Sequence, residues 1–173
     1  MLRYISGLAA ALAVATPAQA QDTVDPDHIA SLLRNADYPA EFFGDVSTYR
    51  QIVSRSGNYE FTVEFFDCTA RKACEVLLFH TAFKKGDDPP TKAEIDAYSG
   101  RQPDGRTFLD RRGDPVVELE LDLTDGFSDT EFTDSLKAWD TMLTDFAGFL
   151  AGAPAPAAPA AAAAPAEAAP ATS

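Results

Sequence analysis

Two cysteines, Cys68 and Cys74, are the residues whose type and spacing point most directly to chemistry. They flank a polar loop at 69–73, and apolar, strand-like sequence lies on both sides. If the two cysteines end neighbouring antiparallel strands, their Cα atoms lie about 4.5–5.5 Å apart, which is within disulfide range. Closing so short a loop stabilises a fold by roughly 2–2.5 kcal/mol on the loop-entropy model. The spacing therefore predicts a structural disulfide.

Two other kinds of cysteine chemistry stay open. A redox-active pair usually has closer cysteines at the start of a helix, where the helix dipole lowers the thiol pKa, and neither condition is met here. A zinc site needs four ligands, and two thiols with His80 leave that set incomplete because His28 is remote. We therefore expect no metal and no cofactor, and we interpret His80 as a partly buried strand residue.

A catalytic set is missing from the rest of the sequence. There is no phosphate-binding glycine loop, no zinc-binding helix motif and no serine elbow. Aspartates gather around Gly126, but aligning this glycine with a calcium-binding loop places Leu121 and Leu123 at ligand positions. We predict that the protein is not an enzyme.

Two sets of residues are candidates for a partner surface. The basic set is Arg101, Arg106, Arg111 and Arg112, and the aromatic set is Phe42, Phe43 and Phe66. The arginines could hold an anion or an acidic partner segment, or they could pair with nearby aspartates. The phenylalanines are hard to place on one buried face, and an exposed one would indicate a partner surface.

The N-terminus has the pattern of an export signal. Arg3 is followed by an apolar run at 5–15, and Ala18 and Ala20 form a small-x-small cleavage site. The run is shorter than the roughly 20 apolar residues that span a bilayer. We predict a signal peptide at 1–20 and a soluble mature protein without a membrane anchor, in an oxidising compartment such as the periplasm.

The charge of the chain limits its partners. It has 27 acidic and 14 basic residues, for a formal net charge of -13. Nucleic acids and anionic lipid surfaces both require a basic footprint, so neither is an expected partner. The acidity favours solubility or a basic partner.

Residues 151–173 are almost entirely alanine and proline, with Glu167 as their charged residue. Recurrent proline blocks a continuous helix, so this stretch is predicted to be a disordered tail. The folded domain is then predicted at 21–150.

Capping signals predict three helices within the folded domain. Asp25 and Pro26 begin the first, which Pro39 stops. The capping-box spacings Thr91 with Glu94 and Ser128 with Glu131 begin the other two. The last helix is predicted to reach about residue 150, with an apolar stripe formed by Phe132, Leu136, Trp139, Leu143, Phe146 and Leu150.

Alternation of apolar and polar residues predicts the strands. It is clearest at 59–67 and 115–123, and weaker strand patterns cover 49–55, 74–83 and 107–110, with a further short one at 41–44. We predict an α+β domain, in the order α-β-β-β-α-β-β-α, with an antiparallel sheet and the helices on one side.

Several segments together resemble the YbjN-like family, which is described as bacterial sensory transduction regulators. They are Ile29-Ala30-Ser31-Leu32-Leu33 leading to Tyr38-Pro39-Ala40, Phe65-Phe66-Asp67-Cys68 with Cys74 after it, Arg106-Thr107-Phe108-Leu109-Asp110 leading to Gly113-Asp114-Pro115-Val116, and Trp139. The resemblance covers about residues 25–150. It implies a fold similar to that of type III secretion chaperones, which often dimerise and bind other polypeptides, so a homodimer is one expected assembly. It carries no catalytic or ligand residues to this chain.

Three functions compete at this point. The first is a periplasmic, non-enzymatic binding or regulatory module that engages an unknown protein partner through its sheet or a dimer groove. The second is a periplasmic enzyme inhibitor with the Cys68–Cys74 loop as a rigid probe. The third is thiol–disulfide exchange.

Overall fold

A computed structural model describes residues 23–44, 51–70, 72–102 and 104–152. The predicted signal at 1–20 lies outside the described residues, and so does the predicted tail apart from residues 151 and 152. The elements are α1 (Pro26–Asn35), β1 (Glu41–Phe43), β2 (Gln51–Ser56), β3 (Tyr59–Phe66), β4 (Val76–Ala82), α2 (Lys92–Ser99), β5 (Arg106–Leu109), β6 (Pro115–Asp122) and α3 (Asp129–Leu150).

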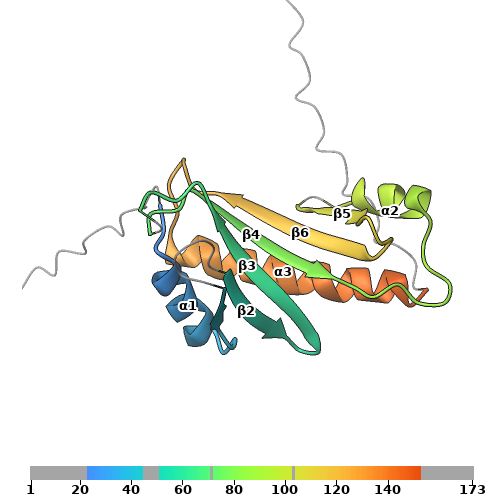
Figure 1. Ribbon diagram of the computed structural model, residues 1–173, viewed down its shortest axis with the longest axis horizontal. Helices are drawn as coiled ribbons and strands as arrows, with labels where there is room; N and C mark the ends of the chain where they lie inside the picture. Colours follow the sequence, from blue (N-terminus) through green and yellow to red (C-terminus); the bar gives the residue numbers. More distant parts are fainter. Residues whose placement is uncertain (1–22, 45–50, 71, 103, 153–173) are drawn as a thin grey trace, which may run out of the picture.

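The strands form one sheet in the order β1-β2-β3-β4-β6-β5, and every neighbouring pair is antiparallel. The predicted α+β class and element order are confirmed. The short strand expected at 41–44 is present as β1 and brings the sheet to six strands. Figure 1 shows β3 and β4 crossing in front of α3, with β6 beside β4.

The helix starts follow the predicted caps. The Asp25 side chain accepts a hydrogen bond from the Asp27 backbone at the start of α1. Reciprocal capping boxes begin α2 at Thr91 and α3 at Ser128, with Glu94 and Glu131 completing them. Each box satisfies backbone N–H groups that a helix start otherwise leaves unpaired, which fixes where these helices begin.

The core lies between one face of the sheet and α3. Phe61 of β3 and Phe79 of β4 stack with ring centroids 6.1 Å apart, and each packs against Trp139 of α3 at 5.6–5.7 Å. All three side chains are almost fully buried. The predicted apolar stripe of α3 therefore faces the core, and aromatic packing joins the helix to the centre of the sheet.

The shorter helices complete this layer. Ile29 and Leu33 of α1 are fully buried, and Tyr98 of α2 packs on Phe146 and Phe149 of α3. All three helices thus contribute to the core on one side of the sheet, as predicted. None of the helices in the described ranges is long and apolar enough to cross a membrane.

The disulfide between Cys68 and Cys74 is present, but its position differs from the prediction. The cysteines do not end the two strands, because the β3–β4 register stops at the pair Phe66 and Val76. Asp67 has a φ of +51°, a left-handed conformation that turns the chain out of the strand one residue before Cys68. Cys74 instead pairs with Val24, so the disulfide also secures the chain that leads into α1.

Candidate functional site: the open face of the sheet

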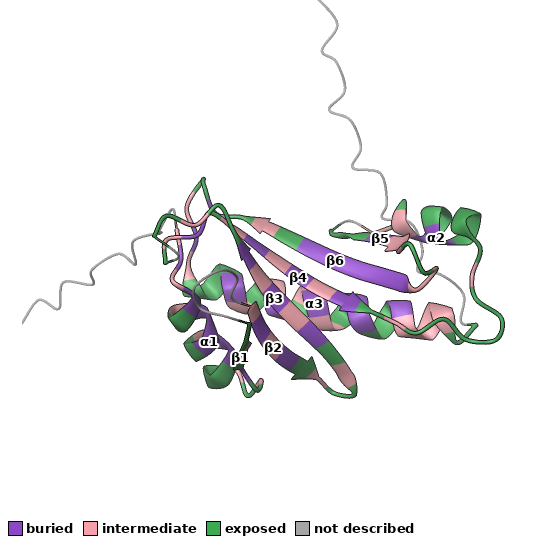
Figure 2. Cartoon of the chain, in the orientation of Figure 1, coloured by how far each residue is buried: buried purple, intermediate pink, exposed green. Residues whose placement is uncertain are grey.

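We call the side of the sheet opposite the helices the open face, because most of its residues are partly or fully exposed, although Val116 and Glu118 are buried. Residues on a strand alternate between faces, so the positions beside each buried core residue belong to it. On the four central strands it consists of Gln51, Val53, Arg55, Glu60, Thr62, Glu64, Phe66, Val76, Leu78, His80, Ala82, Val116, Glu118, Glu120 and Asp122. Figure 2 shows the alternation of burial along β3 and β4.

A three-residue charge network occupies one half of this face. Glu118 of β6 is directly opposite His80 of β4 on one side and Arg106 of β5 on the other. His80 Nδ1 lies 3.0 Å from Glu118 Oε1, and Arg106 Nε donates to Glu118 Oε2 at 2.6 Å. The side chain of Glu118 is only 8% exposed. A carboxylate this buried needs a partner, and Arg106 supplies the compensating charge.

Beside His80 the sheet divides into two branches. The β3–β4 register ends at Thr62 and His80, although β3 begins at Tyr59 and β4 continues to Ala82. A hollow of about 380 Å³ opens there, lined by residues 58–62 and 80–84. The Thr81 hydroxyl donates to the Glu60 carbonyl at 2.6 Å, and both residues are part of the lining. Residues of both faces line the hollow, since Thr62 and His80 belong to the open face and Phe61 faces the core.

The other half of the open face, toward the disulfide, combines apolar side chains with unpaired acids. We call it the acidic half and define it as Glu64, Phe66, Val76, Leu78, Glu120 and Asp122. Leu78 has Glu64 directly opposite on β3 and Glu120 directly opposite on β6. Within the described residues, no cation forms an ion pair with Glu64, Glu120 or Asp122.

Asp122 is the last residue of β6 and belongs to the acidic half. The Thr124 hydroxyl and backbone N–H both donate to its carboxylate, at 2.7 and 2.9 Å, and lower its pKa. The lowered pKa favours the ionised form of this one carboxylate.

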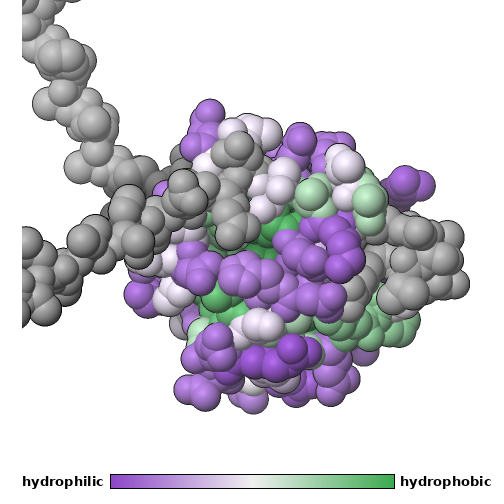
Figure 3. All heavy atoms as spheres, turned by 90° about the vertical axis from the view of Figure 1, so that its left-hand side faces the viewer, coloured by the Kyte–Doolittle hydropathy of each residue, from purple (hydrophilic) through white to green (hydrophobic). Residues whose placement is uncertain are grey.

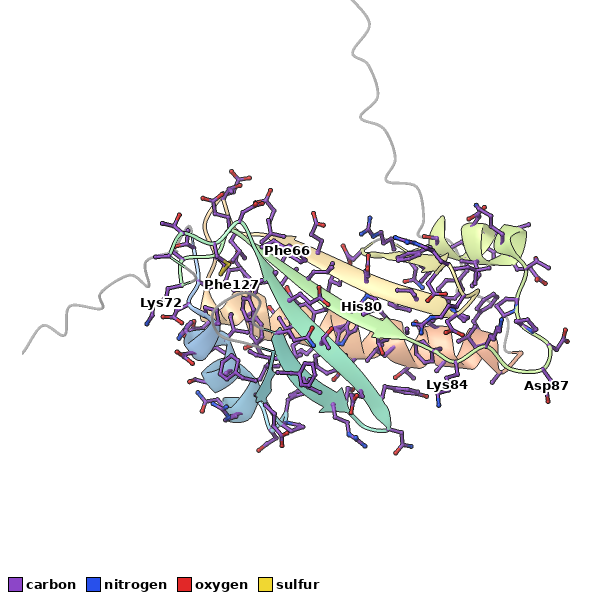
Figure 4. All side chains as sticks on the ribbon, in the orientation of Figure 1. Phe66, Lys72, His80, Lys84, Asp87 and Phe127 are labelled. Atoms are coloured by element: carbon purple, nitrogen blue, oxygen red, sulfur yellow. A yellow bond between two sulfur atoms is a disulfide. The ribbon has the colours of Figure 1, made fainter. Side chains whose placement is uncertain are left out.

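The three candidate phenylalanines separate by face. Phe43 is 65% exposed and Phe66 is 38% exposed, and they are the large hydrophobic side chains left exposed in the described part of the chain. Phe43 pairs with Gln51, which pairs with Glu64, so Phe43 shares the open face. Phe42 instead packs against the core. Figure 4 shows Phe66 near the disulfide end and His80 farther along β4.

The four candidate arginines are not gathered into one anion site. Arg106 belongs to the network with Glu118. Arg112 lies in the β5–β6 turn and pairs with Asp110 and Asp114, and Arg111 beside it is exposed. Arg101 follows α2 and is exposed as well. Hydrogen bonds from the Asp114 and Arg112 backbones lower the pKa of Asp110, so this carboxylate organises the turn.

The two cysteines of the disulfide differ in how far they are buried. Cys74 is fully buried, and Cys68 is partly buried against the core. No group of three or more metal-ligating side chains occurs among the described residues.

Sequence reasoning missed the best-organised part of the open face. The prediction of His80 as a partly buried strand residue is correct, but it did not include the contact between His80 and Glu118. The available signal was the alternation itself, since β4 places Val76, Leu78 and His80 on one face. That pattern shows which residues share a face, but the partners of each come from the pairing of strands distant in sequence.

One comparison with known proteins identifies the family. The family model YbjN, described as "Putative bacterial sensory transduction regulator", matches residues 25–151. This chain belongs to the YbjN family. The match spans every helix and strand, so the open face is part of the YbjN domain. No curated protein and no solved structure matches the chain.

Proposed function

We propose that this YbjN-family protein is an exported, non-enzymatic regulatory module that binds another polypeptide on the open face of its sheet. Family membership supports a regulatory or protein-binding role. The open face is the binding surface because the opposite face is already filled by the three helices.

The observation that carries the proposal is the exposure of Phe43 and Phe66 on a face that also holds the half-buried Val76 and Leu78. Phe43 and Phe66 are not part of the hydrophobic core, so the packing of the core does not account for their presence. Apolar residues that gather on one exposed face, with polar residues around them, are characteristic of protein-binding surfaces.

Export is supported by two independent features of the chain. The N-terminal pattern at 1–20 resembles a cleaved secretory signal. The disulfide between Cys68 and Cys74 is a bond that persists in oxidising compartments such as the periplasm. Cell fractionation with N-terminal sequencing tests this part: we expect a periplasmic protein that begins near Gln21, and a cytoplasmic protein with an intact N-terminus would contradict it.

Photocrosslinking in the cells that make the protein tests the binding surface. A photoreactive residue replaces Thr62 or Leu78 on the open face, or Lys137 or Thr144 on the exposed side of α3 as matched controls. We expect the open-face positions to capture a polypeptide that mass spectrometry identifies and that the purified protein then binds. Capture from α3 alone, or from neither face, would overturn the proposal.

A further inference from the structure

We infer that the acidic half of the open face binds a basic amphipathic helix of a partner polypeptide. The inference rests on the proposed function and adds the chemistry and shape of the partner. Its starting point is the arrangement around Leu78, which has a carboxylate on each neighbouring strand.

The charges of the open face divide sharply between its halves. Glu118 is paired with Arg106 and His80, and Glu60 is paired with Arg55. Glu64 and Glu120 have no ion pair within the described part of the chain. Their negative charge therefore remains available to cations from outside the domain, and such complementarity steers association and fixes orientation.

The spacing of these acids matches a helix. Neighbouring strands lie about 4.7–4.9 Å apart, so the strands that carry Glu64 and Glu120 are separated by about 9–10 Å across β4. An α-helix with its side chains is about 10–12 Å in diameter. A helix laid along β4 would set its apolar stripe on Val76, Leu78 and Phe66. Lysine or arginine side chains on both flanks would reach the two carboxylates.

The length of β4 sets the length of the partner helix. The open-face positions of β4 continue from the acidic half past His80 to Ala82, so a helix laid along β4 has about 20 Å of strand beneath it. At 1.5 Å per residue, this corresponds to a helix of about 13 residues, or between three and four turns.

Other occupants fit this surface less well. A second copy of the chain carries the same excess of acidic residues and would place carboxylates against carboxylates. The Ala/Pro segment at 151–173 has no cation to offer, since Glu167 is its charged residue. Strand addition would use an outer strand, and both outer strands are short: β1 has three residues and β5 has four.

The end of the molecule near α1 is mainly hydrophilic, with hydrophobic residues visible between the polar ones (Figure 3). The acidic half itself combines the apolar side chains of Phe66, Val76 and Leu78 with the carboxylates of three acids, and an amphipathic helix complements such a mixture. An entirely apolar partner would leave the acids unpaired, and an entirely basic one would leave the exposed ring of Phe66 in water.

Peptide binding to the mature protein tests the inference. The probe is an 18-residue helical peptide with a leucine stripe flanked on both sides by lysine, and its counterpart has glutamate in place of every lysine. Fluorescence anisotropy should detect the lysine peptide and not the glutamate peptide. Glu64→Gln/Glu120→Gln should weaken binding about tenfold, since exposed ion pairs each account for up to several-fold in affinity. Binding should also weaken as salt rises.

A matched control and a charge reversal make the outcome specific. Asp87→Asn/Asp88→Asn removes the same charge from the loop after β4, at the opposite end from Phe66 in Figure 4, and should leave binding within twofold of the parent. Glu64→Lys/Glu120→Lys should bind the glutamate peptide instead. Equal losses in the two neutralised variants, or no binding of the lysine peptide, would overturn the inference.

The photocrosslinking experiment described above distinguishes a failure of this inference from a failure of the proposed function. If Leu78 captures a partner segment that is not a basic helix, or a second copy of the chain, the inference is wrong and the open face remains the binding surface. If capture occurs only from α3, the proposed function fails with it.

Discussion

On β4, Leu77 and Phe79 face the helices and are fully buried, whereas Val76, Leu78 and His80 face the opposite way and are only half-buried. The same seven-residue strand thus supplies a close-packed core and a surface of mixed chemistry. The covered face is almost uniformly apolar, while the open face places acids and a histidine beside aliphatic side chains.

The difference separates the face that stabilises this domain from the face that we propose for recognition. Burial of aromatic and aliphatic area against α3 provides the main favourable free energy of folding. The open face contributes little of that area, so its exposed residues can vary in charge with a small effect on folding, whereas the buried Glu118 cannot. Paired substitutions at neighbouring positions on the two faces test this division.

The largest expected effect comes from the covered face. Phe79→Ala removes a ring that packs on Phe61 and Trp139, and it should lower the free energy of unfolding by about 3–5 kcal/mol. Leu78→Ala, one residue away on the open face, should cost about 1 kcal/mol or less, because this side chain is only half-buried. Urea unfolding followed by tryptophan fluorescence measures both. Similar losses in the two variants would mean that something covers the open face.

Local signals in the sequence were sufficient for much of this architecture. Thr91 with Glu94 and Ser128 with Glu131 are pairs three residues apart, and both form the capping boxes that their spacing predicted. The alternation at 115–123 likewise placed β6 to within about a residue of its ends. Such signals work because the interacting groups are neighbours along the chain.

Contacts between distant segments were not predictable in the same way. Glu118 is 12 residues from Arg106 and 38 from His80, so their network exists only once the strand order is fixed. Phe42 and Phe43 face opposite ways on a strand of three residues, which is too short for a periodicity to assign faces. The contacts on the open face, which is the candidate site, could therefore not be predicted from the sequence.

An intermediate effect is expected within the open face, at its charge network. Glu118→Gln leaves Arg106 and His80 without their carboxylate, and it should cost about 1–3 kcal/mol because Glu118 is buried. Glu120→Gln, at the next outward position on β6, should change stability by less than about 0.5 kcal/mol because this side chain is exposed and unpaired. Urea unfolding at constant salt compares them. A larger loss for Glu120→Gln would reverse the distinction between the two halves.

The smallest expected effect comes from a polar contact on the covered side. Tyr38, just beyond α1, donates its hydroxyl hydrogen bond to Asp140 of α3. Burial, followed by this hydrogen bond and the negative charge of Asp140, raises the pKa of Tyr38 to about 12. The neutral phenol is therefore favoured in the folded state. Its stabilisation is complete below pH 10, the ordinary pKa of tyrosine, and is lost as the pH rises toward 12.

Tyr38→Phe should cost about 0.5–1.5 kcal/mol at pH 8, the usual contribution of one hydrogen bond, and it should reduce the loss of stability between pH 10 and 12. Tyr98→Phe is the matched control, because burial also raises the pKa of Tyr98 to about 12 while this variant keeps the contact between Tyr38 and Asp140. Absorbance at 295 nm counts the late-titrating phenols, and each variant should lose one. If Tyr38→Phe loses none, the Tyr38 hydroxyl is free in solution, and the polar contact does not join α1 to α3.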